Sequence, residues 1–298
     1  MPHTTQNPAS LPRRAPHPVV AFALATHPGP TLIVTAVAVV LGVAVGLDAG
    51  RLVLLAAAFL SNQASVGLSN DWLDAARDRA VGRADKPVAL GWISATAVRN
   101  GAFYCAAAAV TLTLPLGLTA TVTHTVFIAS AWAYNLGLKS TPLSVLPYVV
   151  SFGLLPLIVT LALPEPAMAA WWAMGMGAML GVAAHVTNVV PDLDDDRRTG
   201  VRGLPHVLGR VWGGVVTFLA LVAAAVLAAA GPGLAARGEY AGWVDLRWVG
   251  LLATLVIAAL GIVLVVTRPP SRFLFRLIMA AALIDVGALA SSGSRLLG

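Results

Sequence analysis

The sequence predicts an all-α, polytopic membrane protein with nine transmembrane helices, because its composition and the spacing of its apolar segments both differ from those of a soluble domain. Of the 298 residues, 58% are hydrophobic and 11% are charged, whereas soluble domains carry about 25% charged residues. The apolar residues occur in blocks of about 20, the length that a helix needs to cross about 30 Å of hydrocarbon. So few charged residues cannot cover a water-exposed surface, which excludes a soluble fold.

Nine apolar blocks define the predicted helices. They cover residues 29–47, 52–70, 94–117, 119–138, 142–163, 168–190, 206–230, 246–267 and 273–296. The segments between them are too short to hold a soluble domain. We therefore expect a flexible cytoplasmic N-terminal tail over residues 1–18, which is rich in proline, and a single transmembrane domain over residues 19–298.

The distribution of lysine and arginine predicts the orientation of these helices. If the N-terminus is cytoplasmic, fifteen of the 19 basic residues fall on the cytoplasmic side, and the other side receives Arg51, Arg237, Arg247 and Arg295. Basic residues are retained in the cytoplasmic loops of membrane proteins. We therefore expect a multi-pass protein of the cell (inner) membrane with its C-terminus outside. Because the basic residues lie between apolar spans and form no single face, nucleic acid is not an expected partner.

The polar loops that follow the second and sixth blocks repeat each other at a constant offset of 118 residues. Both loops fall on the predicted cytoplasmic side. The identical pairs are Asn70 and Asn188, Asp74 and Asp192, Asp78 and Asp196, Arg79 and Arg197, Gly82 and Gly200, Pro87 and Pro205, Leu90 and Leu208, and Gly91 and Gly209. This pattern indicates two internally repeated halves, and membrane proteins built in this way place their binding site between the repeats.

Both repeated loops carry closely spaced aspartates. In the first, Asp71, Asp74 and Asp78 stand at i, i+3 and i+7, so that three carboxylates line one face of a helix end. In the second, Asp192 and Asp196 stand at i, i+4, with Asp195 beside the same face. We expect the two groups of carboxylates to face one shared site.

The charges of the two loops predict a metal-dependent anion site. Residues 70–92 and residues 188–210 each contain four acidic and four basic residues, so neither loop has spare positive charge for a polyanion. A diphosphate would then bind only together with Mg²⁺, which takes one or two carboxylates plus phosphate oxygens and water. Mn²⁺ is the expected substitute. The basic residues would contact the remaining phosphate oxygens and stabilise a departing diphosphate.

At these residues the sequence resembles the UbiA superfamily of intramembrane prenyltransferases, whose motifs are NDxxDxxxD and DxxxD. The first motif fits from Asn70 to Asp78 and the second from Asp192 to Asp196. The resemblance covers about residues 20–295 and includes Lys86-Pro87, Gly91, the stretch 134–139, Gly200, Pro205 and Leu208-Gly209. It implies nine transmembrane helices around a central cavity that the aspartates cap, and transfer of a prenyl group from a prenyl diphosphate to a lipophilic acceptor, for which an aromatic compound is the expectation.

The resemblance also implies roles for individual residues. Asp71, Asp74, Asp78, Asp192 and Asp196 would be the metal ligands and catalytic carboxylates, and the position of Asp195 adds it to the metal site. Tyr134 is a separate candidate by its position at the cytoplasmic end of the fourth block: its ring face would stabilise an allylic carbocation, or it would touch the diphosphate, and an interfacial tyrosine equally belongs to the ordinary aromatic belt. Diphosphate contacts would come from Asn70, Arg79, Lys86, Lys139, Asn188 and Arg197.

Two features depart from the family pattern. Lys86-Pro87 replaces the Arg-Pro of many members, which keeps the charge but loses the bidentate fork of arginine. The first predicted helix, from His27 through Leu47, contains no arginine or lysine, so it offers no partner for a carboxylated aromatic acceptor.

Other functions fit the sequence to different degrees. A membrane terpene cyclase, which ionises the same substrate without an external acceptor, explains both loops and stays open as the alternative. A transporter would place its coupling carboxylates near the middle of the membrane, and a CDP-alcohol phosphotransferase would have one continuous acidic motif. His185 is a candidate proton acceptor or a packed, hydrogen-bonded residue. The prenyl chain length, the acceptor and the oligomeric state are open.

Overall fold

The computed structural model describes residues 15–190, 193, 196, 200–235, 246–268 and 271–298. Within these residues the structure is helical and contains no β-strand, apart from an isolated bridge between Ala169 and Leu297. The all-α prediction is confirmed for this part of the chain.

Each of the nine predicted blocks coincides with a helix. These helices are α2 (Pro28–Ala44), α3 (Ala49–Ala80), α4 (Ala95–Thr113), α5 (Leu118–Leu136), α6 (Leu146–Leu161), α7 (Trp171–Val189), α9 (Leu204–Ala235), α10 (Leu246–Thr267) and α11 (Arg272–Ser291). A further helix, α1 (Pro18–Ala25), was not predicted. Short 3-10 turns occur at Leu114–Leu116 (η1), Leu138–Ser140 (η2), Pro142–Val145 (η3) and Gly293–Leu296 (η5).

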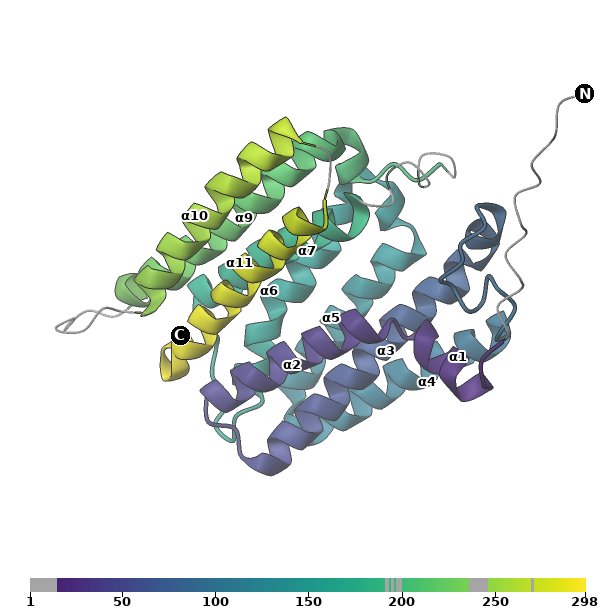
Figure 1. Ribbon diagram of the computed structural model, residues 1–298. Helices are drawn as coiled ribbons and strands as arrows, with labels where there is room; N and C mark the ends of the chain where they lie inside the picture. The colour runs from purple at the N-terminus through teal and green to yellow at the C-terminus, as the bar shows by residue number, and fades with distance from the viewer. Residues whose placement is uncertain (1–14, 191–192, 194–195, 197–199, 236–245, 269–270) are drawn as a thin grey trace, which may run out of the picture.

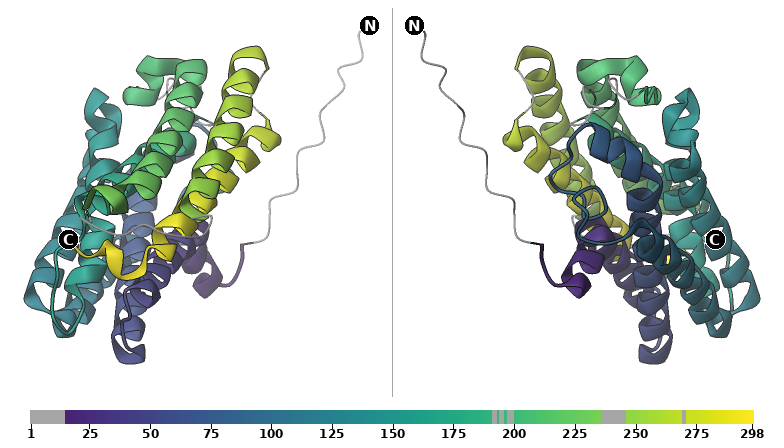
Figure 2. Two further views of the ribbon diagram at one scale, coloured as in Figure 1. Left: turned by 90° about the vertical axis from the view of Figure 1, so that its left-hand side faces the viewer. Right: turned by 90° about the vertical axis from the view of Figure 1, so that its right-hand side faces the viewer.

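The helices form one bundle in which neighbours along the chain pack side by side (Figure 1). The views in Figure 2 show the long helices running roughly parallel or antiparallel to each other. Helix α11 packs against both α9 and α2, so the end of the chain returns to its beginning. The largest apolar core includes Leu41 of α2, Phe59 of α3, Ile158 of α6 and Trp172 of α7, all at most 1% exposed.

Length and composition mark five helices as candidate membrane spans within the described residues, or six if α1 and α2, which meet at a bend of 60°, form one span. Helices α4, α5 and α7 are not among them, so the count of nine stays a prediction. Helix α10 turns apolar side chains outward, and Leu252, Val256 and Val263 are each more than half exposed. An exposed apolar face of this kind suits a lipid environment, and the protein is a multi-pass membrane protein.

Two close backbone contacts position the site that is described below. A Cβ atom at Gly67 of α3 would lie 2.3 Å from the carbonyl oxygen of Thr26, so this glycine lets the junction of α1 and α2 rest on α3. A Cβ atom at Gly181 of α7 would lie 2.5 Å from the carbonyl oxygen of Tyr148 in α6. Small residues allow helix backbones to approach in this way.

Candidate active site

A cavity of about 410 Å³ lies among α2, α3, α5, α6 and α7 and the loops that follow α3 and α7. Asp74, Asp78 and Asp196 contribute carboxylates to its wall, whereas Val34, Phe127 and Phe152 contribute apolar surface. Gln63 and Asp78 both line it although they are 15 residues apart on α3, which corresponds to about 22 Å along a helix. The cavity therefore extends from the carboxylates along a large part of the bundle.

The first acidic motif lies entirely on α3, which continues ten residues beyond the predicted apolar block and ends at Ala80. Carboxylates near a helix C-terminus are unfavourable, but Arg77 and Arg79 occupy the same last turns. Arg77 donates a hydrogen bond to Asp74 Oδ2 at 2.8 Å, and Asn70 Nδ2 donates to the same oxygen at 3.0 Å. These local contacts let the helix run through the motif.

Asp74 is also bound from α5. Lys139, in the short turn after α5, donates a hydrogen bond to Asp74 Oδ1, and Asn135 accepts one from Asn70 Nδ2 at 3.3 Å. Asn135 Nδ2 in turn donates to Ser69 Oγ at 2.8 Å, which docks the end of α5 onto α3. Burial lowers the pKa of the Lys139 ammonium, and the charge of Asp74 opposes this effect.

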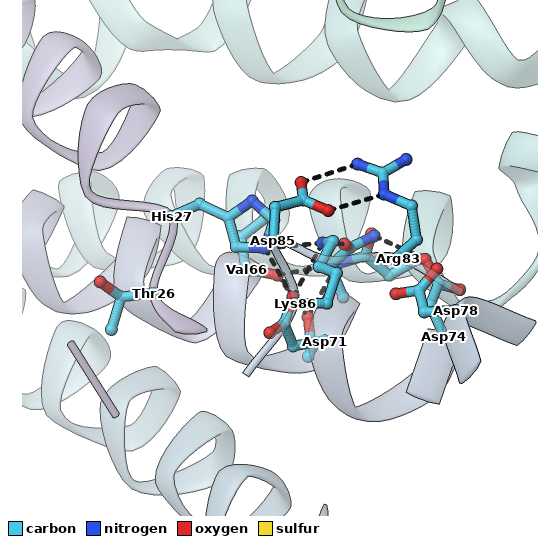
Figure 3. Close-up of polar contacts among 12 residues, drawn as sticks. Thr26, His27, Val66, Asp71, Asp74, Asp78, Arg83, Asp85 and Lys86 are labelled. Atoms are coloured by element: carbon cyan, nitrogen blue, oxygen red, sulfur yellow. Dashed lines mark hydrogen bonds and ion pairs between the residues drawn. The ribbon is translucent and has the colours of Figure 1, made fainter. Parts of the chain in front are cut away.

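Asp71 has a different environment from the other two carboxylates of α3. Figure 3 shows Asp74 and Asp78 together on one side of Lys86, with His27 on the other side and Asp71 next to Lys86. Lys86 Nζ lies 2.8 Å from Asp71 Oδ1 and 3.0 Å from Asn70 Oδ1, and His27 Nε2 lies 2.7 Å from the same Asp71 oxygen. Asp71 is 1% exposed and is not among the residues that line the cavity.

Asp78 is the least occupied of the three carboxylates. Its Oδ2 atom, like that of Asp71, is buried and has no hydrogen-bond partner among the described residues, and its Oδ1 atom has only Arg77 Nε nearby, at 3.9 Å. Further along the loop, Arg83 donates two hydrogen bonds of 2.9 Å to Asp85, which lowers the pKa of the Asp85 carboxyl. Arg79, a predicted diphosphate contact, donates to the carbonyl oxygen of Val88 at 3.4 Å and does not line the cavity.

The second motif is described in part. Asp196 lines the cavity, and its Oδ2 atom lies 3.3 Å from His206 Nε2 of α9. Asn188 also lines the cavity and donates a hydrogen bond to the Tyr148 hydroxyl at 3.3 Å. The other predicted residues of this motif, Asp192, Asp195 and Arg197, lie outside the described residues.

Matched glycines after the two motifs have similar positive φ values, and Gly209 interrupts the helical conformation inside α9. Gly82 and Gly200 have φ values of +69° and +81°, and Gly91 and Gly209 both have +72°. The Arg83 N–H donates to the carbonyl oxygen of Asp78 at 2.9 Å, and the Val201 N–H donates to that of Asp196 at 3.0 Å. A left-handed glycine with this hydrogen bond is a common way to end a helix.

Tyr134 lies inside the cavity wall with other aromatic side chains. Its ring centroid is 5.3 Å from that of Tyr148 and 5.7 Å from that of His185, both in edge-to-face geometry. His185 Nε2 is 3.0 Å from Ser144 Oγ, which also accepts a hydrogen bond from the Leu204 N–H at 2.9 Å. Tyr134 therefore faces the site, and His185 links α7 to η3 and α9.

Three site residues were missed or given no role by the sequence analysis: His27, Asn135 and His206. None of the three was marked by both a motif and the repeat, and their contacts join distant parts of the chain. His27 and Asp71, for example, are 44 positions apart. The repeat gives no signal for His206, because the position 118 residues earlier is Val88. Asn135 belongs to the stretch 134–139 that resembles the family, which was the available signal for it.

The chemistry of the cavity fits Mg²⁺. Within the described part of the chain, no group of three or more acidic, histidine or cysteine side chains is arranged to hold a metal ion by itself. Mg²⁺ does not need such a cage, because it takes one or two carboxylates and completes its shell with phosphate oxygens and water. Asp74, Asp78 and Asp196 offer carboxylates to one cavity, and Asp78 Oδ2 has no hydrogen-bond partner.

Comparisons with known proteins agree with this fold. One similar solved structure is of a digeranylgeranylglyceryl phosphate synthase, with a TM-score of 0.65 and 14% identity, covering 94% of this chain and 99% of that one. A UbiA homolog from Archaeoglobus fulgidus bound to DMAPP and Mg²⁺ has a TM-score of 0.69 and 14% identity, with 93% of this chain and 99% of that one covered. The apo UbiA homolog from Aeropyrum pernix K1 has a TM-score of 0.62 and 18% identity, with 92% of this chain and 97% of that one covered. The curated proteins include no match. The model of the UbiA prenyltransferase family matches residues 31–281. The chain therefore belongs to the UbiA prenyltransferase family.

Proposed function

We propose that this prenyltransferase is a Mg²⁺-dependent intramembrane enzyme that transfers an isoprenyl group from a prenyl diphosphate to a lipophilic acceptor, with an aromatic acceptor as the expectation. The cavity carries this proposal, because carboxylates and lysines meet at one part of it and apolar side chains such as Val34, Phe127 and Phe152 contribute to the rest. Such a cavity matches a ligand with a charged head and a hydrocarbon chain. The Archaeoglobus fulgidus UbiA homolog, which has the same fold, was solved with DMAPP and with GPP, each together with Mg²⁺.

The proposed site divides its residues between metal and diphosphate. Asp74, Asp78 and Asp196 would hold Mg²⁺, together with Asp192 and Asp195 of the second motif; Asp71 is considered separately below. When bound, Mg²⁺ supplies charge neutralisation of the diphosphate. Asn70, Lys86, Lys139 and Asn188 all line the cavity and would donate hydrogen bonds to phosphate oxygens, with Arg197 as a further proposed contact. We assign Arg79 to the support of the loop, since it bonds to Val88.

The chemical step is a displacement that the site favours electrostatically. The C–O bond between prenyl C1 and the diphosphate breaks, and the lysine N–H groups stabilise the negative charge that develops on the leaving oxygen. Tyr134 and Tyr148 line the cavity, and their rings would stabilise positive charge on the allylic group. A bond then forms between C1 and the acceptor, whose proton passes to the released diphosphate. In the cyclase alternative, a double bond of the same chain takes the place of the acceptor.

The fold supports a proposal for the arrangement in the membrane. We expect nine spans in the cell (inner) membrane, made of two repeated halves, with the N-terminus and both acidic motifs on the cytoplasmic side and the C-terminus outside. The matched glycine turns after Asp78 and Asp196 support the repeat. Residues 19–298 would be one transmembrane prenyltransferase domain after a flexible tail.

Product analysis tests the function. The purified protein is incubated with labelled C10 to C20 and longer prenyl diphosphates, a lipid extract as the source of acceptors, and either Mg²⁺, Mn²⁺ or EDTA. We expect a metal-dependent product in which mass spectrometry finds one prenyl group added to a lipophilic acceptor. A cyclic hydrocarbon formed without the extract would favour the cyclase, and consumption that is undiminished in EDTA would contradict the mechanism.

A further inference from the structure

The contacts of Asp71 distinguish it from the carboxylates with which its motif groups it. Asp74 and Asp78 line the cavity, whereas Asp71 is 1% exposed and lies behind Lys86 and His27. One oxygen of Asp71, Oδ1, lies within hydrogen-bond distance of both Lys86 Nζ and His27 Nε2. Asp71 Oδ2 is buried and has no hydrogen-bond partner among the described residues. Because the Asp71 side chain does not line the cavity, a metal ion in the cavity would not contact it.

The hydrogen atoms of this cluster can be assigned from its distances. His27 Nε2 is 2.7 Å from a carboxylate oxygen that has no hydrogen to give, so Nε2 must be the donor. Lys86 Nζ is also 3.0 Å from His27 Nε2, but a nitrogen that donates its hydrogen cannot accept another. Lys86 therefore directs one N–H to Asp71 and one to Asn70. An ammonium has three N–H groups, and the third is left for a ligand in the cavity that Lys86 lines.

The backbone holds His27 in place for this contact. His27 has φ +55°, the only positive value at a non-glycine among the described residues. It stands at the bend between α1 and α2, which rests on Gly67 of α3. Thr31 Oγ1 donates a hydrogen bond to the Thr26 carbonyl oxygen at 2.7 Å and fixes the same junction. Strained backbone of this kind persists where the surrounding structure enforces it, often at functional sites.

We propose that Asp71 and His27 are positioning residues of the diphosphate site and that Asp71 is not a metal ligand. Together they hold the Lys86 ammonium so that its third N–H points to a phosphate oxygen. This inference builds on the proposed function, because it assumes that the cavity binds a diphosphate. It assigns a role to the α1–α2 junction, which lies outside both acidic motifs.

Two matched variants separate positioning from metal binding. Asp71→Asn and Asp74→Asn make the same change one turn apart on α3. Binding of inorganic pyrophosphate to the purified protein in nanodiscs is measured by calorimetry across a series of Mg²⁺ concentrations. We expect Asp71→Asn to weaken pyrophosphate binding about tenfold, the size of one charge-assisted hydrogen bond, with an unchanged Mg²⁺ requirement. Asp74→Asn should raise the Mg²⁺ concentration needed for half-saturation.

A double-mutant cycle tests whether Asp71 acts through Lys86. If it does, Asp71→Asn should have no further effect on pyrophosphate binding once Lys86→Met is present. Additive effects of the two changes, or an altered Mg²⁺ requirement in Asp71→Asn, would overturn the inference alone. A wild-type protein that binds no pyrophosphate at any Mg²⁺ concentration would overturn the proposed function, and the inference with it.

His27 offers a control for the strained backbone. His27→Gly suits the left-handed conformation but removes the imidazole, so we expect unchanged or higher thermal stability together with weaker pyrophosphate binding. His27→Gln retains a side-chain N–H donor and should recover part of the affinity. Wild-type affinity in His27→Gly would contradict the role of His27.

Discussion

Lys139 and Asp74 form an ion pair between the turn after α5 and the acidic face of α3, across 65 positions of the sequence. Arg77 and Asn70 occupy the other oxygen of the same carboxylate. Without a ligand, the Asp74 carboxylate therefore accepts hydrogen bonds from three side chains of the protein, on both of its oxygens. Mg²⁺ that binds at Asp74 competes with these donors, and we expect a donor that it displaces to become available to the diphosphate.

This exchange gives Lys139→Met opposite effects on two ligands. Mg²⁺ alone should bind more tightly, because a competing ammonium is gone, whereas pyrophosphate in saturating Mg²⁺ should bind about tenfold more weakly for lack of one charge-assisted contact. Calorimetry with each ligand measures both. Lys139→Arg, which keeps the charge, is the control, and weaker binding of both ligands in Lys139→Met would contradict the exchange.

The two acidic motifs should act as one unit. Asp74→Ala and Asp192→Ala should each cost about 3 kcal/mol of transition-state stabilisation. The double variant should be hardly worse than either single variant, because groups that act together are strongly non-additive. Asp194 has no place in the family motif, so Asp194→Ala should cause a much smaller loss of transition-state stabilisation. Diphosphate release from geranyl diphosphate is the measurement, and near-normal release in Asp192→Ala would make the second motif structural.

The matched turns after the motifs predict matched stability effects. Gly82 and Gly200 have left-handed φ values and space for a Cβ atom, so alanine meets a conformational cost without a clash. Each change to alanine should lower stability by about 1–2 kcal/mol, and asparagine should cost less. Thermal inactivation of the purified variants measures this. A loss at only one of the two positions would argue against equivalent turns.

The excess of basic residues on one side predicts the orientation of both motifs. In a background in which Cys105 is replaced by serine, cysteines placed at Arg83 and Arg202 should react with an impermeant maleimide only from the cytoplasmic face. A cysteine at Arg237 should react only from the outside. Labelling of positions 83 and 202 from opposite faces would exclude a shared site.

The sequence was sufficient to predict the helices that are long and apolar. Apolar blocks predicted nine of the helices, because a continuous apolar segment of about 20 residues is a strong helix signal in a chain of this composition. The end of α3 was placed too early, since its last turns are polar and are held by contacts such as that of Arg77 with Asp74. Helix α1 has only eight residues, shorter than any membrane span, and hydropathy therefore gave no signal for it.

The candidate site was predictable where a motif or the repeat marked it. Asp74, Asp78, Lys86, Lys139 and Tyr134 all line the predicted cavity. The separate position of Asp71 was not predictable from the i, i+3, i+7 spacing, which places all three carboxylates on one face of α3. Asp71 differs from the other two by its contact with His27. That contact depends on the bend between α1 and α2 and on the close approach at Gly67, which are features of tertiary packing.

The position of the metal ions in the presence of substrate tests the central claim most directly. Crystals of the protein grown with Mn²⁺ and geranyl diphosphate would show the metal by its anomalous scattering. The account predicts Mn²⁺ inside the cavity, bound by Asp74 or Asp78 of α3 and by carboxylates of the second motif, with the diphosphate between them and Lys86 beside a phosphate oxygen. Mn²⁺ bound to Asp71, or a diphosphate bound away from both motifs, would contradict it.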